Sequence, residues 1–299
     1  MRELTYLQAI REAQDQEMAR DARVFILGED VSGNVYGTTA GLVERYGAER
    51  VRDTPISEGG FAGVAVGAAL VGMRPIVDFT ICSFMYLATD ALVSLAAKAA
   101  YMYGTQARVP AVFRAAMFYG GGAAAQHSDR NYAMFAQVPG LKIAIPATPY
   151  DAKGLLKTAV RDDNPVLIFE DGNLWGSRGG VPEDDYTVPL GQAAVRREGT
   201  DVTVVAFAAT VREALAAADT LAGEGVSVEV VDPRTLVPLD RERILESVAK
   251  TGRLVVADPG HRTCGAGAEI AALVAQEGFW TLQAPIVRVS TPDIQVPFS

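Results

Sequence analysis

A single carboxylate stands at the start of a long uncharged segment. Glu58 is followed by small and apolar residues, and the next charged residue along the chain is Arg74. Burying an unpaired carboxylate is costly, so such a group tends to be neutralised rather than to stay charged. Acids in these surroundings are candidates for proton chemistry, although structural acids can share them. The sequence therefore indicates Glu58 as a candidate catalytic acid.

The segment after Glu58 is rich in glycine, with Gly60, Gly63, Gly67 and Gly72. Glycine inside a helix costs about 1 kcal/mol relative to alanine. Four of them suggest that another backbone or a ligand approaches closely. Tight packing of a helix on a sheet explains the same glycines and, for the glycines alone, is the favoured interpretation.

His127 is the second candidate for proton chemistry. It follows the glycine-rich run Tyr119–Gln126 and precedes the residues SDRN. A histidine beside a mobile loop can exchange protons near neutral pH. Considered alone, however, His127 is more typical of a surface loop.

Other kinds of site find little support in the sequence. The chain contains no GxxxxGK[ST], GxSxG, CxxC or HExxH motif, and residues 265–270 (GAGAEI) match only part of a dinucleotide fingerprint. His261 and Cys264 form an isolated HxxC pair, which is more typical of a loop than of a zinc site. These absences argue against a P-loop enzyme, a serine hydrolase of the GxSxG type and a zinc enzyme.

Composition limits the class of protein. The 299 residues carry a formal net charge of −9, so there is no general basic surface for nucleic acid or an anionic membrane. With 49% hydrophobic residues the chain can form a large core, and its two distant cysteines favour a reduced, cytoplasmic protein. The N-terminal residues have an amphipathic helical pattern rather than that of a signal peptide, and residues 59–73 are shorter than the ~20 that span a membrane.

Two series of alternating strands and helices are expected to position these residues. In the first half, apolar runs predict strands, and longer patterns predict helices, which together indicate a parallel sheet covered on both faces. The expected strands are Val24–Leu27, Pro75–Phe79, Ala111–Arg114, Ile143–Ile145 and Val166–Phe169, and the expected helices are Phe61–Val71, Ala88–Tyr103 and Asp151–Val160.

A polar segment separates the first series from the second. Asn173–Pro189 is rich in Gly, Pro and Asp and has no periodicity, so we expect a linker there. The sequence thus predicts two three-layer α/β domains in series, residues 1–180 and 181–299, without an internal repeat. The second alternation consists of strands Val202–Phe207, Val226–Val231, Leu254–Ala257 and Ile286–Val289 with helices Val211–Leu221, Arg241–Ala249 and Ala266–Gln276.

Six motifs, in this order, carry a resemblance to a known family. They are DTPISEGGFAGVAVGAALVGMRPI (53–76), AAQHS (124–128), VPGLKIAIPATPYDAKGLLKTAVRDDNPVLIFE (138–170), GTDVTVVAF (199–207), VEVVDPRTLVPLD (228–240) and GAGAEIAA (265–272). Together they resemble the beta subunit of the thiamine-diphosphate-dependent component of 2-oxo acid dehydrogenases, of the pyruvate, branched-chain or acetoin type. The resemblance covers essentially the whole chain and implies kinship with the second half of transketolase: a pyrimidine-binding domain and a transketolase C-terminal domain.

The resemblance implies a role for Glu58. In this family the acid of the Ser-Glu pair bonds a pyrimidine nitrogen of thiamine diphosphate and promotes the imino tautomer, whose nitrogen removes the proton from the reactive carbon. Ile56 and Phe84 match positions that contact the cofactor, Phe84 by stacking on the aminopyrimidine. Glu29 matches an acid in the passage between two cofactor sites, and His127 a histidine that assists substrate binding and acyl transfer to the lipoyl group. Without the resemblance, Phe84 would be a core residue and Glu29 the cap of a strand end.

The resemblance also implies metal ions. Backbone carbonyls at five positions match a structural potassium site: Ala111, Ala159, Val160, Asp162 and Asn164. Enzymes of this class bind the diphosphate through magnesium on a GDG segment followed by asparagines, whereas the nearest string here is Glu170-Asp171-Gly172-Asn173. The magnesium ligands are therefore expected on a separate alpha subunit, in an α2β2 heterotetramer with active sites at the subunit interfaces.

Several departures from the family pattern surround the predicted site. The run after Arg114 is AAMFYGGG, residues 131–135 are NYAMF, Gln137 replaces a histidine, and Ala91 and Ser94 stand where Gln and Asn are frequent. The sequence also lacks the C-terminal helical tail that lies near the acyltransferase docking region in many relatives. These changes suggest an altered substrate or acyl acceptor with the cofactor chemistry retained.

Three functions are compatible with these observations. The first is oxidative decarboxylation of a 2-oxo acid, with the acyl group passing to the thiol of a lipoyl-bearing acyltransferase or another carrier protein. The second is half of a split transketolase-like enzyme that moves a two-carbon ketol unit from a sugar phosphate to a carrier thiol. The third is a non-catalytic scaffold, which the joint presence of Glu58, Phe84 and His127 disfavours.

Overall fold

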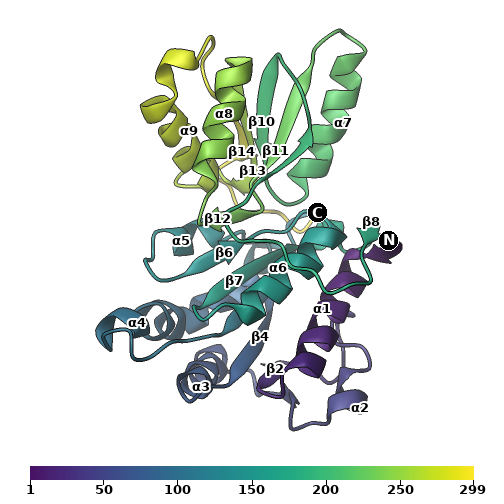
Figure 1. Cartoon of the computed structure of the whole chain (residues 1–299), viewed down its shortest axis with the longest axis vertical. Helices are drawn as coiled ribbons and strands as arrows, with labels where there is room; N and C mark the ends of the chain where they lie inside the picture. Colours follow the sequence, from purple (N-terminus) through teal and green to yellow (C-terminus); the bar gives the residue numbers. More distant parts are fainter.

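The computed structural model describes all residues from 1 to 299 as two α/β bodies, one stacked on the other (Figure 1). The lower body contains a seven-stranded sheet in the order β12-β6-β7-β5-β4-β2-β3, and the upper body a five-stranded sheet in the order β14-β13-β10-β11-β9. Each sheet is mostly parallel, with one antiparallel strand at an edge: β12 in the first and β9 in the second. The predicted fold class is confirmed.

The first sheet is the middle layer of three. Its strands are β2 (Val24–Gly28), β3 (Val51–Asp53), β4 (Arg74–Ile81), β5 (Val112–Met117), β6 (Lys142–Ala144), β7 (Val166–Asp171) and β12 (Thr235–Val237). Phe61 of α3 (Glu58–Leu70) lies in one core cluster with Phe79 and Phe113 of the sheet. On the other face, α1 (Tyr6–Arg20) and α6 (Pro149–Arg161) share a second cluster, which includes Ile10 and Leu155.

Sequence signals explain where these two helices begin. Thr5 and Gln8 form a capping box at α1: the Thr5 hydroxyl accepts from the Gln8 amide and the Gln8 side chain from the Thr5 amide. At α6 the hydroxyl of Thr148 accepts from the amide of Asp151, and Pro149 occupies the first turn. Both α1 and α6 therefore begin at residues whose side chains cap the helix N-terminus.

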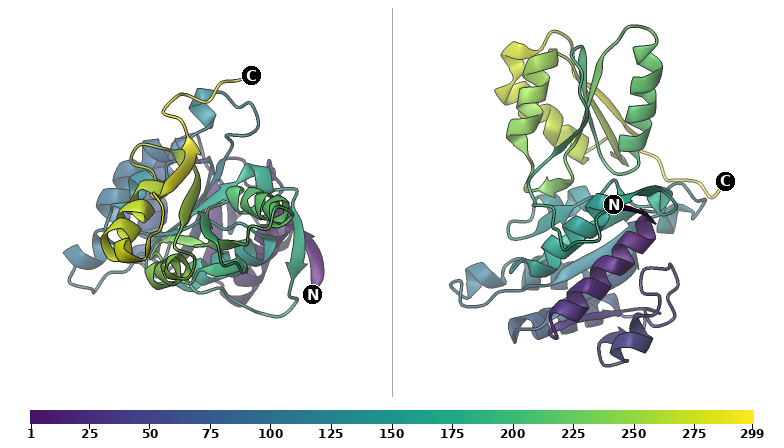
Figure 2. Two further views of the ribbon diagram at one scale, coloured as in Figure 1. Left: turned by 90° about the horizontal axis from the view of Figure 1, so that it is seen from above. Right: turned by 45° about the vertical axis from the view of Figure 1, so that its right-hand side comes forward.

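Helices lie on both faces of the second sheet (Figure 2). Its strands are β9 (Ala194–Arg197), β10 (Val202–Ala206), β11 (Val228–Asp232), β13 (Leu254–His261) and β14 (Val287–Thr291), and its helices are α7 (Thr210–Ala222), α8 (Arg241–Thr251) and α9 (Ala266–Glu277). After β14 the chain returns to the junction of the two bodies, where the C-terminus lies (Figure 2). None of the helices in the molecule combines the length and the hydrophobicity that crossing a bilayer requires.

The expected helix Ala88–Tyr103 is wrong as a single element. The chain forms a 3-10 helix at Cys82–Ala88, a π-helix at Asp90–Ala96 and a short α4 at Ala99–Met102. Tertiary contacts hold the first turn: the Cys82 thiol donates to the carbonyl of Asp129 (3.0 Å), and the Asn131 side chain donates to the carbonyl of Cys82 (2.9 Å). These bonds fix the 3-10 helix that precedes the expected helix, while within it the Ala97 amide donates to the Leu92 carbonyl (3.0 Å), five residues back, as in a π-helix.

The segment expected as a linker, Asn173–Pro189, also contains regular structure. Its strand β8 (Arg178–Val181) pairs antiparallel with the N-terminal strand β1 (Arg2–Thr5). Local periodicity does not reveal this strand because its partner lies at the far end of the sequence. The boundary expected between residues 180 and 181 falls inside β8 and stays a prediction.

Several contacts tie the two bodies together, including the ion pair between Asp151 of α6 and Arg196 of β9. Strand β12 follows β11 in sequence but adds to the first sheet beside β6, with Thr235 opposite Ala144. The Asp171 carboxylate accepts from the amide of Ala209 (2.9 Å), and the Tyr132 hydroxyl donates to Asp258. The orientation of the bodies is therefore held by buried hydrogen bonds as well as by packing.

Candidate functional site

Four predicted residues follow the carboxyl ends of strands in the first sheet. Glu29 directly follows β2, Glu58 opens the helix after β3, Phe84 lies in the 3-10 helix after β4, and His127 lies in the loop after β5. Because these strands are parallel, their carboxyl ends share one edge of the sheet, which is where α/β proteins bind ligands. The structure thus assembles at one edge residues that span about a hundred positions in sequence.

Glu58 is buried beneath an exposed turn. Its side chain is in the first turn of α3 and the residue is 4% exposed, whereas Ile56 is 83% exposed and Ser57 and Gly59 are also exposed. A carboxylate is favoured at this position by the partial positive charge of a helix N-terminus. Glu58 forms no hydrogen bond or ion pair within the chain, so the acid is close to the surface and has no internal partner.

Glu29 lies within the electrostatic field of Glu58. Burial raises the pKa of Glu29, and the negative charge of Glu58 raises it further, with a smaller effect from Asp30. One carboxylate oxygen of Glu29, Oε1, is buried without a hydrogen-bond partner. Two neighbouring acids therefore have hydrogen-bonding capacity that the chain does not use.

Phe84 and His127 contact each other. Their ring centroids are 5.5 Å apart and the rings are perpendicular, an edge-to-face arrangement. Nδ1 of His127 is buried and unpartnered, as is the hydroxyl of Ser83. Ser128 holds the turn at His127, because its hydroxyl donates to the carbonyl of Ala124 (2.7 Å).

Two further polar residues of this site were missed by the sequence reasoning. Arg130 is 5% exposed; its Nη1 donates to the carbonyl of Ser128 (2.7 Å), but its Nε and Nη2 have no partner. The Arg130 guanidinium carbon lies 4.9 Å from the centroid of the Tyr119 ring. Asn131 is equally buried, with an unpartnered Oδ1. The available signal was a charged residue, Arg130, directly before the segment 131–135 that departs from the family pattern.

Below these residues lies a buried ion cluster. Nε and Nη2 of Arg114 donate to Glu170 at 2.8 and 2.6 Å, and its Nη1 contacts Asp78. Burial raises the pKa of Glu170, and the charge of Arg114 opposes that effect. Because three neighbouring strands supply these side chains, the cluster joins β4, β5 and β7 beneath the site.

The string Glu170-Asp171-Gly172-Asn173 is occupied by internal contacts. Asp171 is fully buried and accepts from the Tyr119 hydroxyl (2.6 Å), the Ala209 amide (2.9 Å) and the side chain of Asn173 (3.0 Å). Nowhere in the structure are three or more His, Cys, Asp or Glu side chains gathered so that they could hold a metal ion. Asp171 thus connects the two bodies.

The carbonyls expected to bind potassium lie at the opposite, N-terminal edge of the first sheet. Two of them already accept from one guanidinium nitrogen: Nη1 of Arg74 lies 2.9 Å from the Val160 oxygen and 3.0 Å from the Asp162 oxygen. The Ala111 carbonyl accepts from Val166 and the Ala159 carbonyl from Asp162, while Asn164 donates through its side chain to Asp162. A cationic side chain therefore occupies part of the predicted ion environment.

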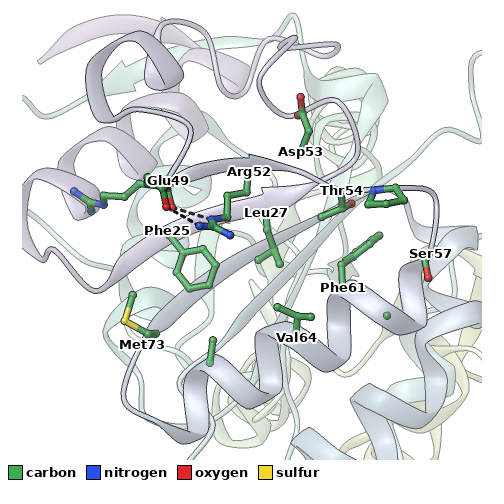
Figure 3. Close-up of a pocket in the computed structure, with 14 residues that line it drawn as sticks. Phe25, Leu27, Glu49, Arg52, Asp53, Thr54, Ser57, Phe61, Val64 and Met73 are labelled. Atoms are coloured by element: carbon green, nitrogen blue, oxygen red, sulfur yellow. Dashed lines mark hydrogen bonds and ion pairs between the residues drawn. The ribbon is translucent and has the colours of Figure 1, made fainter.

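A groove of about 720 Å³ runs beside α3 (Figure 3). Phe25, Leu27, Phe61, Val64 and Met73 provide apolar walls. An Arg52–Glu49 ion pair lies at its margin, and Ser57, the residue before Glu58, lies at the opposite end (Figure 3). The groove adjoins the candidate site but does not include Glu58.

Comparisons with known proteins agree with this architecture. The family described as "Transketolase, pyrimidine binding domain" matches residues 2–175, and "Transketolase, C-terminal domain" matches residues 191–299. A solved structure described as a split gene transketolase in an inactive beta4 tetramer is similar, with a TM-score of 0.81 and 26% identity over 98% of this chain and 91% of that one.

Relatives with higher identity are beta subunits of dehydrogenase complexes. The acetoin:2,6-dichlorophenolindophenol oxidoreductase beta subunit of Cupriavidus necator is 46% identical, covering 100% of this chain and 91% of the relative. The pyruvate dehydrogenase E1 beta subunit of Rickettsia felis is 46% identical (99% and 92% covered), and so is the 2-oxoisovalerate dehydrogenase beta subunit of Bacillus subtilis (97% and 90% covered). The chain belongs to the family of 2-oxo acid dehydrogenase beta subunits, built from the transketolase pyrimidine-binding and C-terminal domains.

Proposed function

We propose that this chain forms a thiamine-diphosphate-dependent 2-oxo acid dehydrogenase with a separate alpha subunit, as an α2β2 heterotetramer. The observation that carries the proposal is Glu58, a buried carboxylate at the C-terminal edge of the sheet that has no partner within the chain. An acid in this state fits a hydrogen-bond donor that arrives from outside, such as a pyrimidine nitrogen. The unpartnered atoms of Glu29 and His127 nearby support a missing polar ligand.

The chain's own residues have distinct tasks in this proposal. Glu58 bonds the pyrimidine nitrogen and holds the shared proton, while Phe84 and Ile56 contact the ring. His127, braced edge-on by Phe84, serves the substrate and the incoming lipoyl thiol. Glu29 is a second acid close enough for the charge of Glu58 to raise its pKa. When bound, thiamine diphosphate supplies the carbon nucleophile that adds to the keto group and accepts the electrons left by carbon dioxide.

The diphosphate and its magnesium ion belong to the alpha subunit in this proposal. Asp171, in the string most similar to a metal-binding segment, is committed to Tyr119, Asn173 and the second body. The product acyl group is passed to a lipoyl-bearing acyltransferase or another carrier protein.

Reconstitution with an alpha subunit that carries the GDG segment and asparagines tests the proposal. The chain alone is expected to bind thiamine diphosphate and magnesium weakly and to show no turnover, while the mixture releases carbon dioxide from a 2-oxo acid. Cofactor-induced circular dichroism measures assembly separately from activity. Tight cofactor binding and turnover by the isolated chain would contradict the proposed division of the site.

His127 allows the two half-reactions to be separated. In the reconstituted complex, His127→Asn should keep most of the kcat for decarboxylation measured with an artificial electron acceptor, with a raised KM for the 2-oxo acid. It should lose ~10²-fold or more in acyl transfer to a lipoyl domain, the usual range for a lost acid–base group. Equal loss of activity in both assays would show that His127 has no specific role in acyl transfer.

Two other functions predict different results in the same assays. A split transketolase-like enzyme, which the similar solved structure supports, would use ketose phosphates and leave 2-oxo acids untouched. A non-catalytic scaffold would assemble with the alpha subunit but show neither activity nor the cofactor signal. Carbon dioxide release that depends on Glu58 argues against both.

A further inference from the structure

Arg130 is a buried cation without a counter-ion. The residue is 5% exposed, no carboxylate lies within ion-pair distance, and Nε and Nη2 are buried without hydrogen-bond partners. The neighbouring Asp129 interacts instead with the Tyr86 hydroxyl. A charged group removed from water without a partner is strongly destabilising, so its presence suggests that a group from outside the chain pairs with it.

Internal contacts hold Arg130 in place but leave two donors free. One nitrogen donates to the carbonyl of Ser128 (2.7 Å), and the guanidinium stacks at 4.9 Å on the ring of Tyr119. Tyr119 is itself fixed by its bond to Asp171 (2.6 Å). Nε and Nη2 of one guanidinium form the planar fork that matches the two oxygens of a carboxylate or phosphate.

The free donors belong to the same site as His127 and Phe84. Arg130 is three residues beyond His127, and the next residue, Asn131, is bonded to the carbonyl of Cys82, which precedes Ser83 and Phe84. Unpartnered polar atoms on Ser83, His127 and Asn131 accompany those of Arg130. In the structure these atoms are covered, so a ligand can reach them only if a neighbouring segment moves.

The reacting carboxylate of a 2-oxo acid is a poor match for this fork. That carboxylate loses its charge as carbon dioxide forms, so a strong ion pair with it would stabilise the ground state more than the transition state. An anionic group that remains on the substrate throughout the reaction is bound equally in both states and contributes to recognition.

We propose that Arg130 binds a second anionic group of the substrate, a carboxylate or phosphate distal to the reacting carbonyl. This inference rests on the proposed function. Within the proposed function it makes Arg130 a specificity-determining residue that selects 2-oxo dicarboxylic acids over 2-oxo acids with uncharged side chains. The same donor pair would bind the phosphate of a ketose phosphate if the chain acts instead as the split transketolase-like enzyme. A distal carboxylate and a phosphate would be bound by the same two donors, and the substrate panel below distinguishes them.

Activity of the reconstituted complex tests the selection. Pyruvate, 2-oxoisovalerate, 2-oxoglutarate and xylulose 5-phosphate are the probes, and wild type is compared with Arg130→Met and Arg130→Lys. For the preferred anionic probe, kcat/KM should fall ~10- to 100-fold in Arg130→Met, the usual effect of losing a charge-assisted bond, and less in Arg130→Lys. For pyruvate and 2-oxoisovalerate, which carry no second anionic group, kcat/KM should change less than ~3-fold. Arg108→Met, which removes an exposed arginine at the opposite edge of the sheet, is the matched control.

A binding measurement without turnover gives an independent readout. Succinate and inorganic phosphate, as unreactive probes, should raise the melting temperature of the wild-type complex and of Arg108→Met, but not that of Arg130→Met, because only a folded state with the donor fork binds them. A purely structural arginine predicts instead a lower melting temperature for Arg130→Met and an unchanged response to the probes.

The outcomes separate this inference from the proposed function. The inference alone is overturned if decarboxylation depends on Glu58 but Arg130→Met affects substrates with and without a distal anionic group equally. In that case the unreactive anions should also give no stabilisation. Absence of any 2-oxo acid turnover overturns the proposed function, and anion-dependent stabilisation lost in Arg130→Met would still support a site for a second anion.

Discussion

Both edges of the first sheet carry charged groups but use them differently. At the N-terminal edge, Arg74 donates to two backbone carbonyls and pairs with Asp163, and Lys142 pairs with Asp162. At the C-terminal edge, Glu58 has no partner and Glu29, His127 and Arg130 keep unpartnered buried atoms. One edge satisfies its polar groups internally, and the other keeps them for molecules outside the chain.

This difference follows from the energetics of buried polar groups. A satisfied network stabilises the fold, whereas an unmade buried bond costs about 1–3 kcal/mol. A protein can tolerate that cost where a ligand or another subunit later forms the bonds. The unpartnered atoms therefore mark the functional edge more clearly than composition or cavity volume does, since the 720 Å³ groove of Figure 3 lies beside Glu58 without including it.

The largest contrast is expected from Glu58→Gln. In the reconstituted complex this variant should lose ~10²-fold or more of decarboxylase activity, the range for a group that moves a proton. Because the wild-type carboxylate has no internal partner, the melting temperature of the isolated chain should not fall. Undiminished activity would remove Glu58 from the mechanism, and a large loss of stability would show that the acid has a structural role.

Arg114→Met tests a fully satisfied cluster just below the same edge. It leaves Glu170 buried and Asp78 half-buried without their cation, which should lower the free energy of unfolding by about 3–5 kcal/mol. Urea unfolding followed by circular dichroism gives the value, and the added change Glu170→Gln should recover part of it. A loss well below that range would indicate that water or local rearrangement replaces the guanidinium.

Arg74→Met tests the satisfied N-terminal edge. The carbonyls of Val160 and Asp162 lose their donor, which should cost about 1–3 kcal/mol of stability without affecting decarboxylation. We expect the wild-type melting temperature to change little when potassium chloride replaces choline chloride, and that of the variant to rise with potassium. Strong potassium dependence of the wild type would show that an ion binds beside Arg74, as the family resemblance implies.

The smallest effect is expected from Glu29→Gln, through pH. Because the pKa of Glu29 is raised in the folded chain, the folded state holds more protons than the unfolded state between the ordinary pKa of 4.5 and the raised value. Stability should therefore fall as pH rises through that window. Glu29→Gln should abolish this fall in stability. Glu58→Gln should make the fall smaller, because removing the charge of Glu58 lowers the pKa of Glu29. Unfolding free energies measured from pH 4 to about 7 provide the comparison; unchanged slopes in both variants would contradict it.

The sequence alone determined the two series of strands and helices and most of the candidate residues. Apolar runs locate β2, β4, β5 and β7 because strands buried in a parallel sheet must be apolar along their length. The isolated acid at Glu58 stands out because charge is otherwise absent from its segment. These features are local, so they can be read without knowing which segments meet.

Only the tertiary structure decided the features that depend on distant partners. Strand β8 requires β1, β12 crosses into the first sheet, and the 3-10 helix before the expected helix Ala88–Tyr103 is held where Asp129 and Asn131 bond to Cys82. The same holds for the arginines: Arg74 reaches carbonyls some 86 residues away, while Arg130 is buried with no carboxylate in reach. A hydrogen bond depends on position in space, and side chains adjacent in space here come from segments far apart in the chain.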